Sequence, residues 1–256
     1  MTKTLPPLIY ENLLPTRDYM QDATKVLGSL QRAFLPANPH DWQHGLEVGM
    51  RGPLTQAFRI QNETIRGSLD LVRHKVRLGS TNWALHEYAG PELLNNVRVW
   101  LQSRGLQVVL EQPDFAPGAH HFDEEQAKNY AEALWWFEER FRELSEELKP
   151  GLVSPILLYP HHFDISLSWF PYDDERQLNL GFSTGDQTIP EPYVYLTAYP
   201  EPKGFMKVPL PSPAYWQSSG FTGAILRYSD LEATDQPEVL LGAFLRTFQA
   251  SAPLLA

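Results

Sequence analysis

Apolar side chains recur every three to four residues in four stretches of the chain, which is the spacing of one face of an α-helix. Thr16 is of a type favoured at an N-cap, and Pro36 ends the first stretch. The third stretch is the longest, and Asp123 with Gln126 has the spacing of a capping box. The predicted helices cover residues 16–35, 91–105, 123–148 and 237–248.

Between these helices lie short runs in which apolar and polar residues alternate, which is typical of β-strands with one buried face. Turn-forming residues separate the runs, so each set predicts an antiparallel meander. The runs of the first set cover residues 43–51, 64–72, 74–80 and 82–89. Those of the second set cover residues 155–160, 163–170, 177–183, 192–199 and 223–229, with 106–110 as an extra strand before them.

The order of these elements repeats along the chain. In each half a helix is followed by a Pro-His turn, about four strands and a closing helix; the turns are 39–42 and 160–163. We therefore predict an α+β fold made of a duplicated strand-helix-meander-helix unit, with a curved antiparallel sheet and helices packed on one face. The chain is expected to form a single globular domain, 1–256, with pseudo-repeats 1–105 and 106–256.

Composition narrows the classes of partner. The 256 residues carry a formal net charge of −10, and their 21 Lys and Arg are scattered, which opposes binding to nucleic acid. The absence of cysteine excludes disulfides and thiolate ligands. No apolar run reaches the roughly 20 residues of a membrane span, so we expect a cytoplasmic protein that binds no membrane. The sequence leaves open whether the protein forms a homo-oligomer.

Three blocks of the sequence resemble those of a bacterial family of uncharacterised proteins, a domain of unknown function. The blocks are 36–55, 153–170 and 193–205, and the resemblance extends from Thr16 to Phe248. They contain the Arg-Gly, Ser-Pro with Phe-Asp, and Tyr-Pro-x-Pro-x-Gly-Phe patterns of the family. The matching residues are Trp42, His44, Arg51, Gly52, Ser154, Pro155, Phe163, Asp164, Tyr199, Pro200, Pro202, Gly204 and Phe205.

The resemblance implies a common fold but no reaction. Members of the family commonly carry a histidine and a tryptophan in the first helix, where this chain has Asp18 and Met20. They also carry a His-Glu pair after the second block, where this chain reads LGFSTGD. If those positions form a family site, this chain lacks part of it.

Asp164 and His44 are the sharpest candidates for chemistry. On the strand 163–170, Asp164 points away from the apolar face, and we expect it to accept hydrogen bonds at the start of the strand. The alternative is that it anchors a ligand on an open sheet face. His44 alternates with apolar residues, which predicts a satisfied core histidine; the alternative is a pocket histidine.

Metal binding would need histidines from both halves. Adjacent His161 and His162 would point apart on a strand, and Pro39 argues against a helix that would align His40 with His44. Only a cluster of His40 or His44 with His161 or His162 and Asp164 would supply three ligands. We therefore assign no metal and no other cofactor.

Two functions remain. The first is a protein that binds a small organic ligand or a partner segment on the open sheet face. The second is an enzyme with a histidine and aspartate site, with or without a metal. No catalytic residue is assigned. The candidate ligand-binding residues are Trp42, His44, Arg51, His162, Asp164 and Tyr199.

Overall fold

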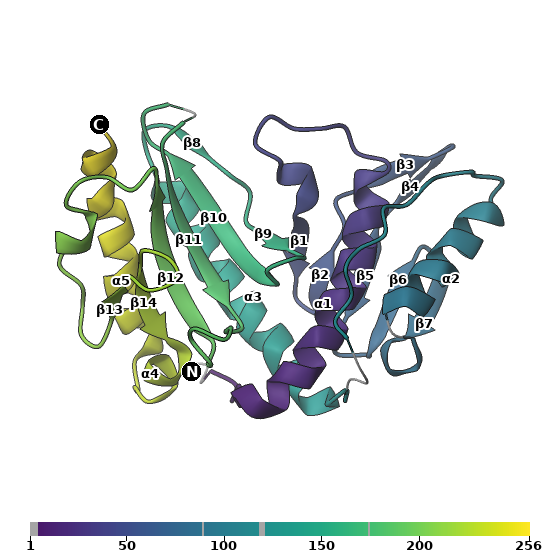
Figure 1. Ribbon diagram of the computed structural model, residues 1–256, viewed down its shortest axis with the longest axis horizontal. Helices are drawn as coiled ribbons and strands as arrows, with labels where there is room; N and C mark the ends of the chain where they lie inside the picture. The colour runs from purple at the N-terminus through teal and green to yellow at the C-terminus, as the bar shows by residue number, and fades with distance from the viewer. Residues whose placement is uncertain (1–4, 89, 118–120, 174) are drawn as a thin grey trace. The chain divides into compact units, whose positions relative to one another are not determined.

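The computed structural model describes residues 5–88, 90–117, 121–173 and 175–256, which form two compact units (Figure 1). Unit 1 consists of Met1–Tyr10, Trp136–Ile156 and Asp164–Ala256, and unit 2 of Glu11–Trp135 and Leu157–Phe163. Both units therefore combine segments that are far apart in the sequence. The duplication into 1–105 and 106–256 stays a prediction, because compactness does not measure internal similarity.

Unit 2 contains an antiparallel sheet of short strands. In spatial order they are β9 (Leu157–Tyr159), β1 (Leu46–Gly49), β2 (Gly52–Leu54), β5 (Gly67–Asp70), β6 (Lys75–Leu78) and β7 (Thr81–Ala84). A separate hairpin is formed by β3 (Phe58–Ile60) and β4 (Glu63–Ile65). The predicted meander of the first half is thus confirmed as antiparallel.

The helices of unit 2 include most of α1 (Tyr10–Arg32) and all of α2 (Gly90–Gln102). A Cβ at Gly67 of β5 would lie 2.9 Å from the Leu27 side chain of α1. The Trp100 indole of α2 donates a hydrogen bond to Thr81 of β7. Gly67 pairs with Leu78, which in turn pairs with Thr81, so these positions share one face of the sheet and both helices lie on it.

Unit 1 has the same kind of architecture. Its strands, in spatial order, are β13 (Tyr215–Gln217), β14 (Gly223–Arg227), β12 (Tyr193–Tyr199), β11 (Gln177–Ser183) and β10 (Asp164–Phe170), with β8 (Leu152–Val153) paired to β10. The short helix α4 (Tyr228–Glu232) follows β14.

Two helices cover one face of this sheet. They are α5 (Pro237–Ser251) and the second half of α3 (Glu124–Glu147), whose first half belongs to unit 2. Phe248 of α5 packs on Trp169, and Phe137 of α3 stacks on Phe182 with ring centroids 4.1 Å apart. The apolar row of β10 and the helix faces predicted from periodicity therefore form this core, and the α+β class is confirmed.

Several boundaries differ from the prediction. Helix α1 begins at Tyr10 and contains Pro15, because Leu13 continues the buried apolar stripe of the helix. Thr16 is not an N-cap: its hydroxyl donates to the carbonyl of His121 and accepts from the backbone N–H of Asp123. Residues 106–110 form no strand, and Val109 is 93% exposed. The prediction missed β2, β3, β8, β13 and α4.

The third predicted helix is confirmed together with its cap, because Asp123 Oδ1 accepts the backbone N–H of Glu125 and Gln126. Trp136 is 2% exposed, with Phe137 against one side and the Arg140 guanidinium over its ring. In the part of the chain that the structure describes, no helix combines the length and apolar character required to cross a membrane.

Candidate functional site

Asp164 is the first residue of β10, and the hydrogen bonding predicted for it is confirmed. The Tyr195 hydroxyl of β12 donates to Asp164 Oδ2. A Cβ at Gly181, between them on β11, would lie 2.3 Å from the Tyr195 ring, so only glycine lets the ring cross this strand. Although the ring keeps some exposure, burial of the hydroxyl raises the pKa of Tyr195 well above its usual value, and the Asp164 carboxylate raises it further.

The remainder of this sheet face is largely occupied by its own side chains. The Ser168 hydroxyl donates to Asn179 Oδ1 at 2.8 Å, and the Tyr193 hydroxyl donates to Asp186 Oδ2 at 3.0 Å. Tyr193 is buried in an apolar cluster, and burial raises the pKa of its hydroxyl. The cluster contains Ile189, Tyr193 and Ile225, with Tyr195, Tyr215 and Phe221 against it. The face expected to be open is therefore partly covered.

The first Pro-His turn differs from the expected strand. Trp42–His44 form a turn of 3-10 helix after Asp41, whose φ of 58° lies in the left-handed region. His40 stacks on Trp42 with ring centroids 5.0 Å apart. The His44 side chain is 42% exposed, so the prediction of a core histidine is wrong. The apolar alternation was misread because the strand begins only at Leu46.

The second Pro-His turn follows β9. His161 and His162 belong to the turn and not to a strand, and Phe163 has a φ of 54°. The imidazole rings of His161 and His162 lie side by side, with centroids 4.6 Å apart, so the expectation that these side chains point apart is wrong. Both histidines are exposed, whereas Phe163 is buried and stacks on Tyr130.

Strand pairing brings the two Pro-His turns together. In the antiparallel pair of β1 and β9, Leu46 lies opposite Leu158. Continued beyond the strands, this register places His44 opposite Pro160. A Cβ at Gly45 would lie 2.6 Å from Leu157 Cβ, so a glycine is needed where the two segments approach.

A pocket of about 470 Å³ in unit 2 is lined by both turns. This volume lies within the range of sites that hold small organic ligands. The lining comes from four segments that are distant in the sequence. Its residues are Lys25, Arg32, His44, Glu111, Pro113, Asp114, Pro160 and His161.

One face of α1 holds the walls of this pocket in place. Gln21 Nε2 donates to the carbonyls of Pro160 and His161 at 3.1 and 2.8 Å. Ser29 Oγ donates to the carbonyl of Glu111 at 2.6 Å. Gln21, Lys25 and Ser29 follow one another at intervals of four residues and therefore share a helix face, where they form one polar row that binds both neighbouring segments.

The two cations of the pocket are also held in place. Lys25 Nζ donates to the carbonyl of Asp114 at 2.8 Å and lies 3.3 Å from Asp22 Oδ1. Arg32 donates from Nε and Nη2 to Glu111 Oε2 at 3.0 and 2.7 Å. Contacts within the protein thus fix the polar walls of the pocket.

Burial against the pocket wall lowers the pKa of His161, although the residue as a whole is exposed. The neighbouring positive charges, of His162, Arg32, His44 and Lys25, lower it further. His161 is therefore neutral near pH 7. A neutral imidazole can accept a proton or a hydrogen bond from a ligand in the pocket.

The cluster required for a metal is incomplete. His44 and His161 do line one pocket, as the metal hypothesis required, but Asp164 belongs to unit 1 and binds Tyr195. Within the described ranges, no group of three or more His, Asp or Glu side chains is placed to hold a metal ion. The chemistry of this pocket is that of imidazole, ammonium, guanidinium and carboxylate groups.

The other candidate residues lie elsewhere. Arg51 lines a different pocket of unit 2, of about 480 Å³, where its Nε lies 3.4 Å from Asp70 Oδ2. Tyr199, at the end of β12, is 66% exposed. Neither Tyr199 nor Trp42 lines these two pockets, although the Trp42 carbonyl accepts a hydrogen bond from Gln56 Nε2.

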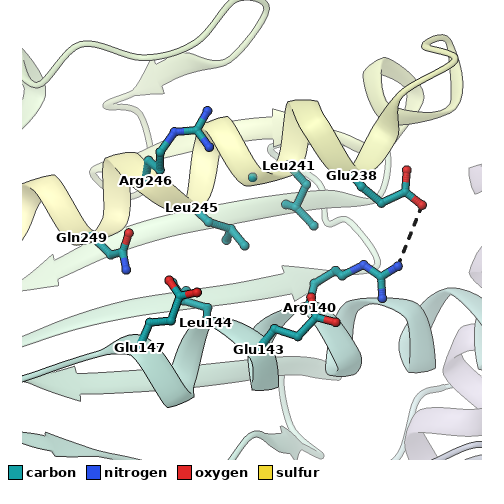
Figure 2. Close-up of a pocket in the computed structure, with 10 residues that line it drawn as sticks. Arg140, Glu143, Leu144, Glu147, Glu238, Leu241, Leu245, Arg246 and Gln249 are labelled. Carbon is teal, nitrogen blue, oxygen red and sulfur yellow. Dashed lines mark ion pairs between the residues drawn. The ribbon is translucent and has the colours of Figure 1, made fainter.

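A groove of about 490 Å³ runs between α3 and α5 of unit 1 (Figure 2). Leu144, Leu241 and Leu245 line it, and each is less than a tenth exposed. Arg140 and Glu238 form an ion pair across it at 3.8 Å (Figure 2). These features describe two packed helices more than a ligand site.

Sequence reasoning missed Lys25, Arg32 and Glu111. Lys25 and Arg32 lie on the polar side of a helix, and Glu111 lies between the second and third predicted helices, where no element was predicted. The available signal was the spacing of Gln21, Lys25 and Arg32 on one helix face with Gly28 among them. A Cβ at Gly28 would lie 3.2 Å from Pro160, so this glycine marks where the second Pro-His turn approaches the helix.

Comparison with family models gives one match, to a family of unknown function (DUF5996), over residues 5–177 and 171–256. The expected membership in a family of unknown function is thereby confirmed, whereas the three blocks and the bacterial origin stay predictions. No curated protein and no solved structure matches the chain.

Proposed function

Because the chain belongs to the DUF5996 family, whose function is unknown, we propose a function from its pocket: the protein binds a small polar organic ligand between the two Pro-His turns of unit 2. One observation carries this proposal. Four distant segments converge on one pocket, and hydrogen bonds from α1 hold the second Pro-His turn and residues 111–114 in place. Such preorganisation reduces the entropy that a ligand must lose when it binds.

The proposal moves the ligand from the sheet face to this pocket. On the sheet face, the phenol of Tyr195 and the carboxylate of Asp164 bind each other, and an apolar cluster fills the neighbouring surface. In the pocket, His44 and His161 each keep exposed surface. A cytoplasmic location and a small-molecule partner, without nucleic acid or membrane, remain part of this proposal.

Native mass spectrometry of freshly purified protein tests the proposal. We expect a retained small molecule in the wild type and its loss in His44→Trp, because the larger ring fills the pocket. His86→Trp is the matched control, since His86 is a half-exposed histidine that does not line the pocket. Thermal melts are the control that tests whether both variants fold. If His44→Trp folds and retains the same molecule as the wild type, the pocket is not the site.

Acid-base catalysis in the same pocket is the second candidate function. It is favoured by one observation: His161 is exposed to the pocket and its pKa is lowered, so that it is neutral and can act as a base. The retained ligand, incubated with the protein, should then change in mass or be released as a product. Recovery of the intact ligand after prolonged incubation argues against catalysis and leaves binding as the function.

A further inference from the structure

The ion pair of Arg32 and Glu111 has an unequal exposure. The Arg32 side chain is 23% exposed, whereas the Glu111 side chain is 68% exposed. Both nitrogen atoms of the guanidinium that bind Glu111 contact the same oxygen, Oε2. The carboxylate therefore reaches a partly buried cation from the solvent side and can be exchanged for another oxyanion.

The surroundings of Arg32 favour such an exchange. Lys25, whose side chain is 16% exposed, lines the same pocket, as do the imidazoles of His44 and His161. The Asp22 carboxylate accepts the backbone N–H of Ala116 with both of its oxygens and pairs with Lys25 through one of them. Asp114, which also lines the pocket, binds Lys25 through its carbonyl. The Glu111 carboxylate is thus the anion that Arg32 holds.

We propose that the ligand of this pocket binds through an oxyanion, a carboxylate or a phosphate, which takes the place of the Glu111 carboxylate on Arg32. This inference rests on the function proposed above and assigns the chemical class of the ligand. Glu111 acts as an internal competitor that keeps the site occupied when no ligand is present.

The energetics of the exchange are favourable. An exposed ion pair contributes little to stability, so displacement of Glu111 costs little. An arriving oxyanion gains a charge-assisted hydrogen bond to a planar guanidinium, which suits both carboxylate and phosphate. Lys25 then supplies a further donor, and each neutral imidazole, of His44 and His161, can donate through its one N–H.

Two substitutions with opposite effects test the inference. Glu111→Gln removes the competing charge and should tighten the binding of inorganic phosphate or succinate by about three-fold, the effect of one exposed ion pair. Arg32→Gln should weaken the binding by about ten-fold or more. The matched controls are Glu63→Gln and Arg59→Gln, both exposed residues on the β3 and β4 hairpin, and they should bind like the wild type.

Binding is measured by isothermal titration calorimetry and by the imidazole NMR signals of His161, with glycerol as a neutral probe. Saturation by phosphate alone assigns a phosphate group, and saturation by succinate alone assigns a carboxylate. If Arg32→Gln melts early, Arg32→Lys serves instead; it keeps the charge without the planar fork and should bind about three-fold more weakly.

Affinity that is unchanged or weaker in Glu111→Gln overturns the inference, as does unchanged affinity in a folded Arg32→Gln variant. If neither anion binds, but the protein retains a neutral molecule that His44→Trp expels, the oxyanion inference fails and the proposed function stands. If no small molecule binds at all, both fail.

Discussion

Asp164 in unit 1 and Glu111 in unit 2 are both carboxylates held by one side chain, yet their settings differ. Asp164 binds the Tyr195 phenol on a sheet face that aromatic and apolar side chains cover. Glu111 is 68% exposed and binds Arg32 at the edge of a pocket. The comparison shows that the same type of side chain is enclosed by its neighbours in one setting and open to exchange with solvent in the other. Asp164 was the more conspicuous residue in the sequence, but Glu111 is the residue that lines the pocket.

The largest effect should come from Asp164→Ala, and it should be on stability. Loss of the carboxylate leaves the buried Tyr195 hydroxyl without this acceptor, which costs about 2 kcal/mol of unfolding free energy. Urea denaturation measures the change. Asp235→Ala, at an exposed position, should cost less than about 0.5 kcal/mol. Phosphate binding should be unaffected in both variants, and its loss in Asp164→Ala would contradict a purely structural role for Asp164.

The tyrosines of the sheet face should make the protein sensitive to alkali. Burial raises the pKa of Tyr195, so the native state keeps its proton when the unfolded chain loses it above about pH 10. The unfolding free energy is therefore intact below pH 10 and falls as the pH rises further, by at most about 1.4 kcal/mol per pH unit for one tyrosine.

Tyr195→Phe should make this alkaline slope shallower, whereas Tyr199→Phe, at a position 66% exposed, should leave it unchanged. Chemical denaturation at a series of pH values above 9 gives both slopes. Equal slopes for the two variants would show that burial of Tyr195 does not control its titration.

A smaller effect is expected where α1 holds the second Pro-His turn. Gln21→Ala removes two hydrogen bonds to the carbonyls of Pro160 and His161, and it should cost about 1 kcal/mol. The loosened turn should also weaken phosphate binding by about three-fold, since part of the preorganisation is lost. Gln102→Ala, exposed at the end of α2, is the control for calorimetry and melting. Unchanged affinity in Gln21→Ala would mean that the turn needs no support from α1.

The smallest effect concerns the stability of the protein in mild acid. The pKa of His161 is lowered, so below about pH 6.5 the unfolded chain takes up a proton that the native state does not. Stability is therefore present above that pH and lost as the pH falls toward the lowered pKa. His161→Gln should reduce this loss, by less than about 0.5 kcal/mol, whereas His86→Gln should not. Thermal melts at a series of pH values between 7 and 5 measure the loss of stability. The same loss in both variants would contradict a lowered pKa of His161.

Local patterns predicted most of the helices and the longer strands. The capping residue Asp123 and the alternating row Ile165, Leu167 and Trp169 act over a few residues, so the sequence displays them directly. The boundaries of α1 and the turn at Trp42–His44 were wrong because tertiary contacts decide them. Thr16, for example, binds backbone groups near residue 122 instead of capping its own helix.

The pocket could not be predicted in the same way. The convergence of His44 and His161 depends on the pairing of β1 with β9, whose partner no local pattern specifies. The role of Arg32 depends on a segment without regular structure, since Glu111 lies between α2 and α3. The residue types of a site can be recognised from the sequence, but the tertiary fold decides which of them are neighbours.

Unit 2 is discontinuous in the chain, and this has a consequence for its synthesis. Strand β1 is synthesised together with its neighbour β2, but its other neighbour, β9, leaves the ribosome on the order of ten seconds after β1. During that interval the outer edge of β1 lacks its native partner, and unpaired strand edges promote aggregation. The two halves of the pocket meet only when Leu157–Phe163 has been made. Translation rate and chaperone access around that point should therefore influence how much functional protein a cell obtains.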